Sequence, residues 1–587
     1  MNYSLKIYDS KNNEGINALN LIKQFLVFLS GEQIKLIIAL IIILLNAAAN
    51  ILAPFLLGYT IDHFIQQKNL AGITQYSLIL LGVYCVVLVT SYLQTVIMGR
   101  LGQDILYRLR NALFAKIQSL PLAFFNQNKL GDLISRINND TDKLNQFFSQ
   151  SLIQFVSTIF TILGIGIFIF FIHIELAVVT LSTAFVLVII TYGISSWINK
   201  QNRLSLQSLG GLSAEIQESL NYFKVIISFD RRDYFRQNFE QVNKINFTSS
   251  VKAGIANNIS MPLYDLSGNI ASVLVLIFGM YLILHGQMTV GVLVTFLSYT
   301  DKFYTPLRQM ASVWSNAQLA LAGWNRIFEI LKLESDMPIV PSEQRHETDH
   351  IMQFKNIQFG YTEDKRILKN ANFTFNIGKT YAIVGPTGGG KSTIASLMTR
   401  LYDPQEGTVY FEGSDIKTYP REVLSEKIGF ILQDLYLFTG TVGENIAYGN
   451  PKYATYSKSK LAAELKNLGL ELLIEKFENG LDTAVTPSTE SISTGQKQLI
   501  SFIRAIIRQP DILIMDEATA NIDTVTEGIL QTIIDALPSK TTKVIIAHRL
   551  NTIKNADEIY FVNNGVVQTA GSFERSMELI LKTKRNS

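Results

Sequence analysis

The sequence has 587 residues, of which 48% are hydrophobic and 17% are charged. This composition is too apolar for an ordinary soluble enzyme and indicates a membrane component. The formal net charge of +3 excludes the strongly basic surface that nucleic-acid binding requires. Cys85 is the single cysteine, so the chain forms neither an intrachain disulfide nor a cysteine-rich metal site.

Six runs of about 20 apolar residues lie in the first part of the chain, and a helix of that length crosses the hydrocarbon of a bilayer. Residues 36–45 are all Ile, Leu or Ala, so this run lacks the polar stripe of a helix on the surface of a soluble protein. We therefore predict six transmembrane helices, over residues 36–57, 77–98, 152–172, 176–198, 268–284 and 289–307.

Basic residues are concentrated in two long loops between these runs, residues 99–151 and 199–267, with seven and eight Lys or Arg. The alternate loops contain a single Lys or Arg, which is Lys68. Because positive charge is retained on the cytoplasmic side, both termini and both long loops are predicted to be cytoplasmic in a multi-pass protein of the cell membrane. Each long loop has few helix breakers, which predicts two transmembrane helices that continue into the cytoplasm and are joined by a short turn helix.

A polar segment, residues 335–349 with Pro338 and Pro341, follows the last apolar run and is typical of a linker. Beyond it, short β-branched runs alternate with helical stretches, as in an α/β domain. We expect a six-helix membrane α-helical bundle over residues 1–334 and, after this linker, an α/β P-loop nucleotide-binding domain over residues 350–587.

One motif has a phosphate-binding pattern in its required context. An apolar strand, residues 381–384, precedes a glycine-rich loop, and helical sequence follows it. Glycines allow backbone N–H groups to surround phosphates, Lys391 neutralises their charge, and the hydroxyl of Ser392 can bind Mg²⁺. The predicted ATP-binding residues of this motif are Gly385, Pro386, Thr387, Gly388, Gly389, Gly390, Lys391, Ser392 and Thr393.

Two further strands end in residues that suit phosphoryl chemistry. Residues 512–515 are followed by Asp516, which can organise Mg²⁺, and by Glu517, which can orient or deprotonate the attacking water. Residues 543–547 are followed by His548. Taken singly, an acidic or histidine strand end is as compatible with a structural role as with a catalytic one.

Together with Tyr361 and Gln433, these elements resemble the nucleotide-binding domain of ATP-binding-cassette proteins. The order is that of the family: an aromatic residue for adenine at Tyr361, Walker A, Q-loop, signature, Walker B, D-loop and switch histidine. The resemblance implies that ATP is the ligand and Mg²⁺ the cofactor. Mg²⁺ would be bound by Ser392, Gln433 and Asp516.

The same resemblance implies the roles of the remaining site residues. Glu517 would act on the attacking water, with His548 and Gln433 as its catalytic neighbours. Each site of such a dimer combines the Walker motifs of one chain with the signature of the other. The residues directed to the partner's nucleotide are Ser493, Thr494, Gly495 and Gln496, with Asp523 of the D-loop.

The membrane half also resembles the multidrug and lipid exporter branch of this family. In that branch two helical cytoplasmic loops transmit closure of the nucleotide domains to the membrane helices, and this chain has loops of suitable length. The residues that carry the resemblance are Phe124, Phe125, Gly131, Asp132, Arg136 and Asp140 in the first loop, and Ala322, Arg326 and Ile327 after the sixth run.

The signature departs from the family pattern. The family reads Leu-Ser-Gly-Gly-Gln, whereas this chain has Ile492 first and Thr494 in place of the first glycine. The preceding acidic stretch of the family is replaced by Thr-Pro-Ser-Thr at residues 486–489. An unaltered Walker half beside an altered signature favours a heterodimer with a second half-transporter. A homodimer that tolerates threonine is the alternative.

Four polar residues lie within the predicted membrane spans. Asn46 and Asn50 share one face of the first span, which favours interhelical hydrogen bonds over the wall of a substrate cavity. Asp301 and Lys302 in the sixth span are expected to form a mutual pair near the interface, with contact to substrate as the alternative.

These features predict ATP-driven export of a hydrophobic or amphipathic substrate, such as a drug, a lipid or a peptide, by alternating access. The expected partners are the lipid membrane and a second half-transporter, with no nucleic acid. A membrane regulator or channel that is gated by ATP is the alternative from another functional class, although no added regulatory domain supports it.

Overall fold

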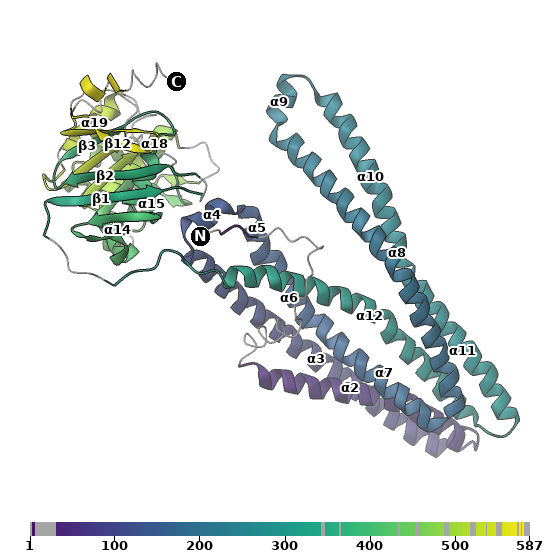
Figure 1. Ribbon diagram of the computed structural model, residues 1–587. Coiled ribbons are helices and arrows are strands. Elements are labelled where there is room, and N and C mark those ends of the chain that lie inside the picture. The colour runs from purple at the N-terminus through teal and green to yellow at the C-terminus, as the bar shows by residue number, and fades with distance from the viewer. Residues whose placement is uncertain are drawn as a thin grey trace. The chain divides into compact units, whose positions relative to one another are not determined.

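The chain forms two compact units in the computed structural model. The helical unit comprises residues 5–118 and 130–332, and the other unit comprises residues 1–4, 119–129 and 333–587 (Figure 1). The structure describes residues 3–5, 31–341, 347–362, 365–432, 435–453, 457–486, 492–516, 524–535, 537–546, 555–571, 574–576 and 578–579.

The helical unit consists of long helices interrupted by short π-helical turns. The π-helical turns are Ile61–Ile65, Arg136–Asp140 and Phe147–Ser151. The α-helices are α2 (Gln33–Thr60), α3 (Leu70–Ser119), α5 (Leu130–Ser135), α6 (Thr141–Gln146), α7 (Leu152–Ile172), α8 (Ile174–Asn221), α9 (Phe223–Ser228), α10 (Arg232–Asn258), α11 (Ser260–Leu284) and α12 (Val290–Leu331).

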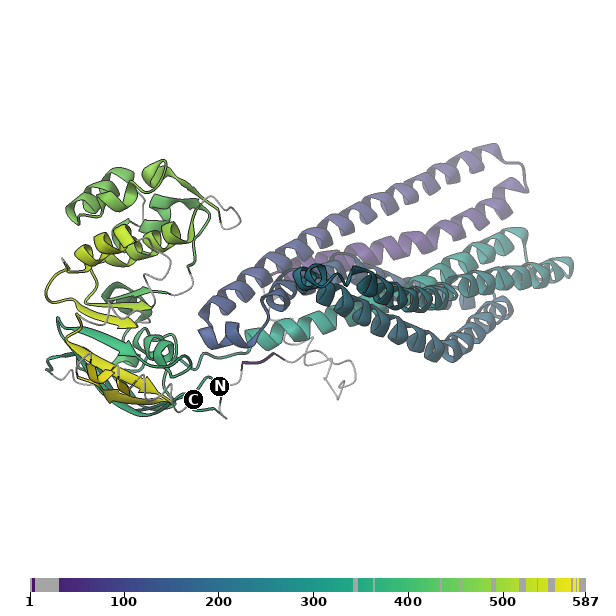
Figure 2. The same cartoon turned by 90° about the horizontal axis from the view of Figure 1, so that it is seen from above.

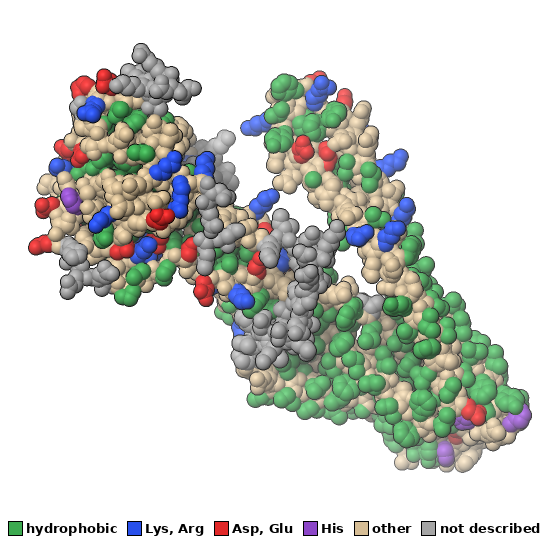
Figure 3. Space-filling model, viewed as in Figure 1, with side chains coloured by type: hydrophobic (Ala, Val, Ile, Leu, Met, Phe, Trp, Pro, Cys, Tyr) green, Lys and Arg blue, Asp and Glu red, His purple; other side chains and the backbone are tan. Residues whose placement is uncertain are grey.

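Five helical segments of the described residues are long and apolar enough to cross a membrane. The sixth predicted span lies in α12, which packs against α2, α7 and α11 but has more polar side chains, among them Asp301 and Lys302. Many apolar side chains of these helices are exposed, as in a protein whose solvent is lipid (Figure 3). The five segments are Gln33–Ile65, Leu70–Ser119, Leu130–Ile172, Ile174–Asn221 and Arg232–Leu284.

The prediction of helices that continue beyond the apolar spans is confirmed for both long loops. Helix α3 has 50 residues and α8 has 48, far more than a bilayer requires. The first loop turns at α4 (Leu122–Gln127), and the second turns at α9. Figure 1 shows α8 and α10 as a long hairpin with α9 at its tip, and Figure 2 shows the long helices of the chain from above.

The two asparagines of α2 make the interhelical hydrogen bonds that the sequence favours. Asn46 Nδ2 donates to Thr90 Oγ1 (2.8 Å) and to Ser91 Oγ (2.9 Å) of α3. Asn50 Nδ2 donates to Asn46 Oδ1 (3.1 Å) within α2, and Asn50 Oδ1 accepts from Lys302 Nζ (3.3 Å) of α12. A hydrogen bond of this kind satisfies a polar group that has no water partner in hydrocarbon.

The expected pairing of Asp301 with Lys302 is wrong. Within residues 31–341, all of which the structure describes, the ion pairs do not join these two side chains, and Lys302 Nζ instead donates to Asn50 Oδ1 (3.3 Å). Successive residues of a helix point about 100° apart, so neighbours in sequence do not face each other. Asp301 is exposed.

Helices α2 and α12 approach each other closely where both carry glycine. A Cβ atom added to Gly58 would lie 1.9 Å from Thr295 Oγ1 and 2.5 Å from the carbonyl oxygen of Gly291. Small residues at such a crossing allow backbone contact, which substitutes for the hydrophobic effect between helices in lipid.

A buried charge network joins the first loop to the end of α12. The side chain of Arg136 is 2% exposed, and its guanidinium contacts Asp132 Oδ2 (2.9 Å) and Glu329 Oε2 (2.8 Å). Arg326 contacts Asp132 Oδ1 (2.5 Å) and the fully buried Asp140 (3.1 Å). The four charged residues that carried the family resemblance, Asp132, Arg136, Asp140 and Arg326, therefore belong to a single cluster.

The second unit contains two main sheets and the helices that pack on them. A four-stranded antiparallel sheet has the order β2-β1-β4-β5, and a six-stranded sheet has the order β12-β11-β3-β10-β9-β6. The strands are β1 (His350–Phe359), β2 (Leu368–Asn376), β3 (Thr380–Val384), β4 (Glu406–Phe411), β5 (Ser414–Asp415), β6 (Ile428–Ile431), β7 (Gly440–Thr441), β8 (Ala484–Val485), β9 (Ile512–Asp516), β10 (Thr542–Ile546), β11 (Glu558–Asn563) and β12 (Val566–Thr569).

Two hydrophobic cores hold this unit together. One core lies between the two sheets and includes Phe354, Phe375, Tyr381 and Ile514. The other lies under α18 and includes Leu461, Phe502 and Leu513. The helices of this unit are α4, α13 (Lys391–Met398), α14 (Arg421–Lys427), α15 (Val442–Ala447), α16 (Lys458–Asn467), α17 (Glu471–Ile474), α18 (Thr494–Ile506) and α19 (Thr524–Asp535), with 3₁₀ turns at Ile416–Thr418, Pro451–Tyr453 and Gly480–Asp482.

The fold class predicted from sequence is therefore confirmed: a membrane helical bundle is fused to an α/β P-loop domain. The short segments 1–4 and 119–129 are grouped with the α/β domain although they are distant from it in sequence. Between α12 and β1, the described residues 333–341 and 347–349 contain no helix or strand.

Replacement of Arg136 by methionine is expected to destabilise the helical unit strongly. The substitution keeps an apolar side chain of similar length but removes the cation of the network, and breaking a buried ion pair costs roughly 3–5 kcal/mol. The partner carboxylates Asp132 and Glu329 are 39% and 30% exposed, so the lower figure applies. The thermal unfolding midpoint of the purified chain in detergent measures the effect.

The matched control is Arg236→Met, because Arg236 forms a similar i,i+4 pair with Glu240 on the surface of α10. Both of these side chains are mostly exposed, so their pair contributes little to stability. Equal shifts of the unfolding midpoint in the two variants would contradict a stabilising role for the buried network.

Candidate functional site

The parallel strands of the six-stranded sheet bring the sequence-predicted motifs to one edge. Ile546 of β10 is opposite both Ile383 of β3 and Asp516 of β9, and Met515 is opposite Ile431 of β6. Adjacent strands are about 4.8 Å apart, so the loop after β3 and the end of β9 are separated by roughly 10 Å across the sheet. A nucleoside triphosphate is long enough to span that distance.

The loop after β3 has the backbone of a phosphate-binding loop. Gly385, Gly388 and Gly390 have φ angles of +148°, +79° and +114°, which side chains with a Cβ atom rarely adopt. A Cβ atom at Gly385 would also lie 2.0 Å from the carbonyl oxygen of Val562 in β11. All three glycines are therefore required by backbone conformation, and Gly385 is also required by packing of the loop against the sheet.

Lys391 begins α13 and folds back across this loop. Its Nζ donates to the carbonyl oxygens of Gly385 (2.9 Å) and Pro386 (3.0 Å), and the side chain is buried. The ammonium group is thus held over the backbone that would surround phosphate, at the N-terminus of a helix. The helix dipole and the lysine both favour an anion there.

Tyr361 lies beside the phosphate loop and is partly exposed. Its hydroxyl group is 3.2 Å from Thr393 Oγ1 of α13, and 45% of the residue is exposed. Phe359 and Tyr402 contact its ring edge to face, each with a centroid distance of 5.2 Å. This support keeps the ring in place for stacking on an adenine base.

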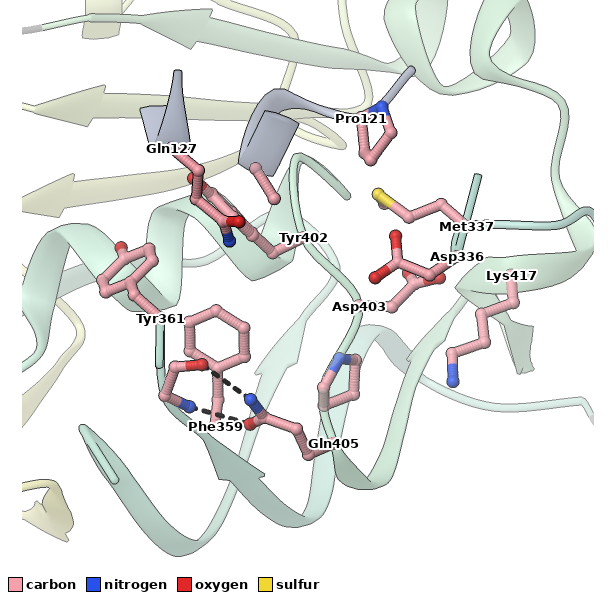
Figure 4. A pocket seen from close by; sticks show the side chains of 13 residues that line it. Pro121, Gln127, Asp336, Met337, Phe359, Tyr361, Tyr402, Asp403, Gln405 and Lys417 are labelled. Atoms are coloured by element: carbon pink, nitrogen blue, oxygen red, sulfur yellow. Dashed lines mark hydrogen bonds between the residues drawn. The ribbon is translucent and has the colours of Figure 1, made fainter. Parts of the chain in front are cut away.

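A pocket of about 260 Å³ lies behind Tyr361, between the α/β domain and the turn of the first loop (Figure 4). Gln405 fixes the backbone on one side: Gly360 N donates to its Oε1 (2.8 Å), and its Nε2 donates to Gly360 O (2.6 Å). Pro121, Gln127, Asp336 and Met337 line another side.

Helix α4 at the turn of the first loop is hydrogen-bonded to the aromatic cluster around Tyr361. Asn126 Nδ2 donates to the hydroxyl oxygen of Tyr402 (2.6 Å). Burial raises the pKa of Tyr402, so its hydroxyl group stays protonated at neutral pH. Only two side-chain contacts therefore separate the expected adenine site from α4.

The residues at the sheet edge suit Mg²⁺. Asp516 is 6% exposed at the carboxyl end of β9, and Ser392 is exposed in the first turn of α13. A carboxylate and a hydroxyl are hard oxygen ligands, and Mg²⁺ at phosphate sites uses one or two such protein groups beside phosphate oxygens and water. The donor set of the described residues therefore fits this ion.

The altered signature occupies the start of α18. Ser493 is the N-cap: its Oγ accepts from Gln496 N (3.2 Å), and Gln496 Oε1 accepts from Ser493 N (2.9 Å). Thr494 is the first helical residue and is exposed. Because helical backbone suits any L-residue, Thr494 is unstrained, and a glycine here would serve only close approach of another molecule.

Four of the sequence-predicted site residues lie outside the described residues: Gln433, Glu517, Asp523 and His548. The strands that precede Gln433, Glu517 and His548 end at the same edge as the phosphate loop. Sequence reasoning missed Tyr402, Gln405 and Asn126. Their partners are tens to hundreds of residues away, and no local pattern marks them.

Two family models match the chain. The transmembrane region of ABC transporters matches residues 36–307, and the ABC transporter ATP-binding model matches residues 368–520. The first match includes the part of α12 that is less apolar than the other spans.

Relatives resemble nearly the whole chain. An uncharacterized ABC transporter ATP-binding protein of Bacillus subtilis, YfiC, is 34% identical over 93% of this chain and 90% of its own length. A fatty acid ABC transporter ATP-binding/permease protein of Mycobacterium bovis is 30% identical over 86% of this chain and 80% of its own. An ATP-dependent lipid A-core flippase of Syntrophus aciditrophicus is 29% identical over 96% of this chain and 93% of its own length.

A solved structure has the same architecture. A bacterial Atm1-family ABC exporter with ATP bound is 25% identical, with a TM-score of 0.77 over 94% of this chain and 97% of its own. The alignment includes both the membrane helices and the ATP-binding domain. The chain therefore belongs to the ATP-binding-cassette transporters, as a multi-pass membrane exporter that acts as a dimer and hydrolyses ATP in a cytoplasmic domain.

Proposed function

We propose that the chain exports a hydrophobic or amphipathic substrate by alternating access and that it does so as one half of a heterodimer. The observation that carries the substrate class is the apolar character of the membrane helices, whose few polar groups, such as Asn46 and Lys302, are hydrogen-bonded to other residues of the bundle. The names of a fatty acid transporter and a lipid A-core flippase among the relatives support it.

The proposed cycle begins when ATP binds between two nucleotide domains. Tyr361 stacks on the base, and the N–H groups of the loop at 385–390 surround the phosphates. Lys391 exchanges its two carbonyl contacts for phosphate oxygens, so its charge is pre-positioned and needs only a short movement. The signature of the partner, at the start of its own helix, closes the site.

Hydrolysis is proposed to reset the transporter. Ser392, Gln433 and Asp516 would hold Mg²⁺, which neutralises charge on the β- and γ-phosphate oxygens when bound. Glu517 orients and deprotonates the attacking water, and His548 supports the γ-phosphate. Such a site acts mostly by positioning and electrostatics, so loss of one carboxylate stops turnover without preventing nucleotide binding.

The exposed Thr494 supports the heterodimer. Its side chain projects from the first turn of α18, where the partner's nucleotide would approach in the closed dimer. In a homodimer both sites would contain this β-branched residue, whereas in a heterodimer the Walker half of this chain meets the signature of its partner. We therefore propose that this chain contributes the hydrolysing Walker half and the altered signature half.

Transport itself is tested with proteoliposomes. The assembled transporter is expected to translocate a fluorescent phospholipid or a hydrophobic cationic dye in the presence of hydrolysable ATP, and a non-hydrolysable analogue should not support it. Translocation of both probes at equal rates with either nucleotide would contradict a pump and favour a gated channel.

Two substitutions separate the catalytic step from the binding of ATP. Glu517→Gln should lower kcat for ATP roughly 10²-fold or more, the usual contribution of a general base, while ATP still binds. Lys391→Ala should instead weaken ATP binding about 10- to 100-fold, because it removes charged hydrogen bonds. Equilibrium binding of a fluorescent ATP analogue and steady-state hydrolysis measure the two effects.

In this pair of variants each serves as the control of the other. If the assembled complex with Glu517→Gln hydrolyses ATP at a near-normal rate, the role given to the glutamate is wrong. If Lys391→Ala binds the analogue as tightly as the unaltered chain, the phosphate contact of the lysine is wrong.

A further prediction concerns the two ATP sites, which differ from each other in the proposed heterodimer. The chain alone should hydrolyse ATP slowly, and co-expression with a second half-transporter should restore activity. Thr494→Gly should then raise kcat of the isolated chain severalfold and change the pair little, because in the pair Thr494 serves only the slower site. Thr494→Ser, which is smaller but keeps a hydroxyl group, is the matched control. The kcat of the isolated chain with this change should lie between those of the unaltered chain and of Thr494→Gly. Full activity of the purified chain by itself would refute the asymmetric arrangement.

A further inference from the structure

Tyr3 is fully buried although it lies far from the folded domains in sequence. It is 1% exposed and is among the largest buried side chains of the described residues. It also lies outside residues 36–307 and 368–520, which the family models match. Two sets of contacts bury it.

One set of contacts joins Tyr3 to α4. The backbone N–H of Tyr3 donates to Gln127 Oε1 (2.7 Å), and Asn128 Nδ2 donates to the carbonyl oxygen of Tyr3 (2.9 Å). The ring of Tyr3 packs edge to face on Phe124, with a centroid distance of 6.4 Å and an angle of 86°. Phe124 is itself fully buried in α4.

A second set of contacts joins Tyr3 to the segment that leaves α12. Its hydroxyl group donates to the carbonyl oxygen of Glu334 (3.3 Å) and accepts from the backbone N–H of Asp336 (2.8 Å). Burial, with a smaller contribution from Asp336, raises the pKa of Tyr3 to about 12. The hydroxyl group therefore keeps its proton, and with it the bond to Glu334, across the physiological pH range.

The segment to which Tyr3 is bound is fixed to the ATP-binding domain. Arg400 is buried after the phosphate-loop helix and donates to the carbonyl oxygen of Pro338 (2.8 Å). Val340 N donates to the carbonyl oxygen of Lys417 (3.1 Å). Tyr3 thus connects α4 to backbone that the domain already holds.

We propose that Tyr3 is a positioning residue that anchors α4 to the ATP-binding domain of its own chain, so that α4 follows this domain as a rigid attachment. Helix α4 has six residues, too few to be stable without tertiary contacts. It has two attachments, the Asn126–Tyr402 hydrogen bond beside the adenine site and the Tyr3 anchor on the linker side, and the pocket of Figure 4 lies between them.

The inference rests on the proposed function, because an anchor at this turn matters for transport only if the first loop carries the nucleotide signal to the membrane. A helix held by two attachments transmits a displacement of the domain to α3, to which it is linked through residues 120 and 121. With the Tyr3 attachment removed, part of that displacement would be lost in local motion of α4.

The anchor itself is tested without nucleotide or substrate. Hydrogen exchange of the backbone amides of residues 122–127 is measured on the full chain in lipid nanodiscs. Tyr3→Ala should accelerate exchange in this segment at least tenfold, and Tyr3→Phe, which keeps the ring but loses the hydroxyl group, should give an intermediate rate. Arg236→Met, which removes an exposed ion pair of α10, is the control and should leave exchange of this segment unchanged.

Function is tested on the same variants in the assembled transporter. Tyr3→Ala should lower kcat for ATP hydrolysis about three- to tenfold with KM for ATP within twofold of the unaltered protein, because nucleotide binding does not involve α4. Should Tyr3→Ala fail to fold, Tyr3→Leu supplies the same comparison. Unchanged exchange of residues 122–127 in these variants would refute the anchor whether or not the chain transports. Accelerated exchange with an unaltered kcat would refute the role of Tyr3 in coupling. Accelerated exchange with a KM for ATP that rises by the same factor as kcat falls would also refute it.

Discussion

The parallel register of β3, β10 and β9 is the constraint on which the ATP-binding unit depends. It places the last residue of β9 and the glycine-rich loop after β3 at the same edge of one sheet. Parallel strands need long crossover connections, so residues of one site come from segments 130 residues apart in sequence. The same edge includes the end of β6, which precedes Gln433 in the sequence. Every strand that precedes an expected catalytic residue therefore ends at this edge.

Around this edge, the phosphate loop is already in a prepared form. Gly385 and Gly389 pack against Val562 of β11 at distances that exclude a Cβ atom, and Lys391 already crosses the loop. A site that is built before its ligand arrives does not lose binding energy to rearrangement.

We propose that the turn of the first loop couples ATP hydrolysis to movement of the membrane helices. Helix α4 is grouped with the ATP-binding domain and not with the helical unit from which it emerges. Its links run through Tyr402 to Tyr361 on one side and through Tyr3 to the linker on the other. Beyond the turn, the Arg136 network binds the first loop to the end of α12.

The sequence by itself determined the class of the protein, its six apolar runs, the helical extensions of both long loops and the phosphate-binding loop. These features are local: helix length, glycine spacing and charge bias act within a few residues of one another. It did not determine how Lys302 is satisfied, because the partner Asn50 belongs to another helix. Nor did it reveal Tyr402, Gln405 or Tyr3, since hydrogen bonds between residues 45 to 333 positions apart depend on how the elements pack, and that packing is decided only by the tertiary structure.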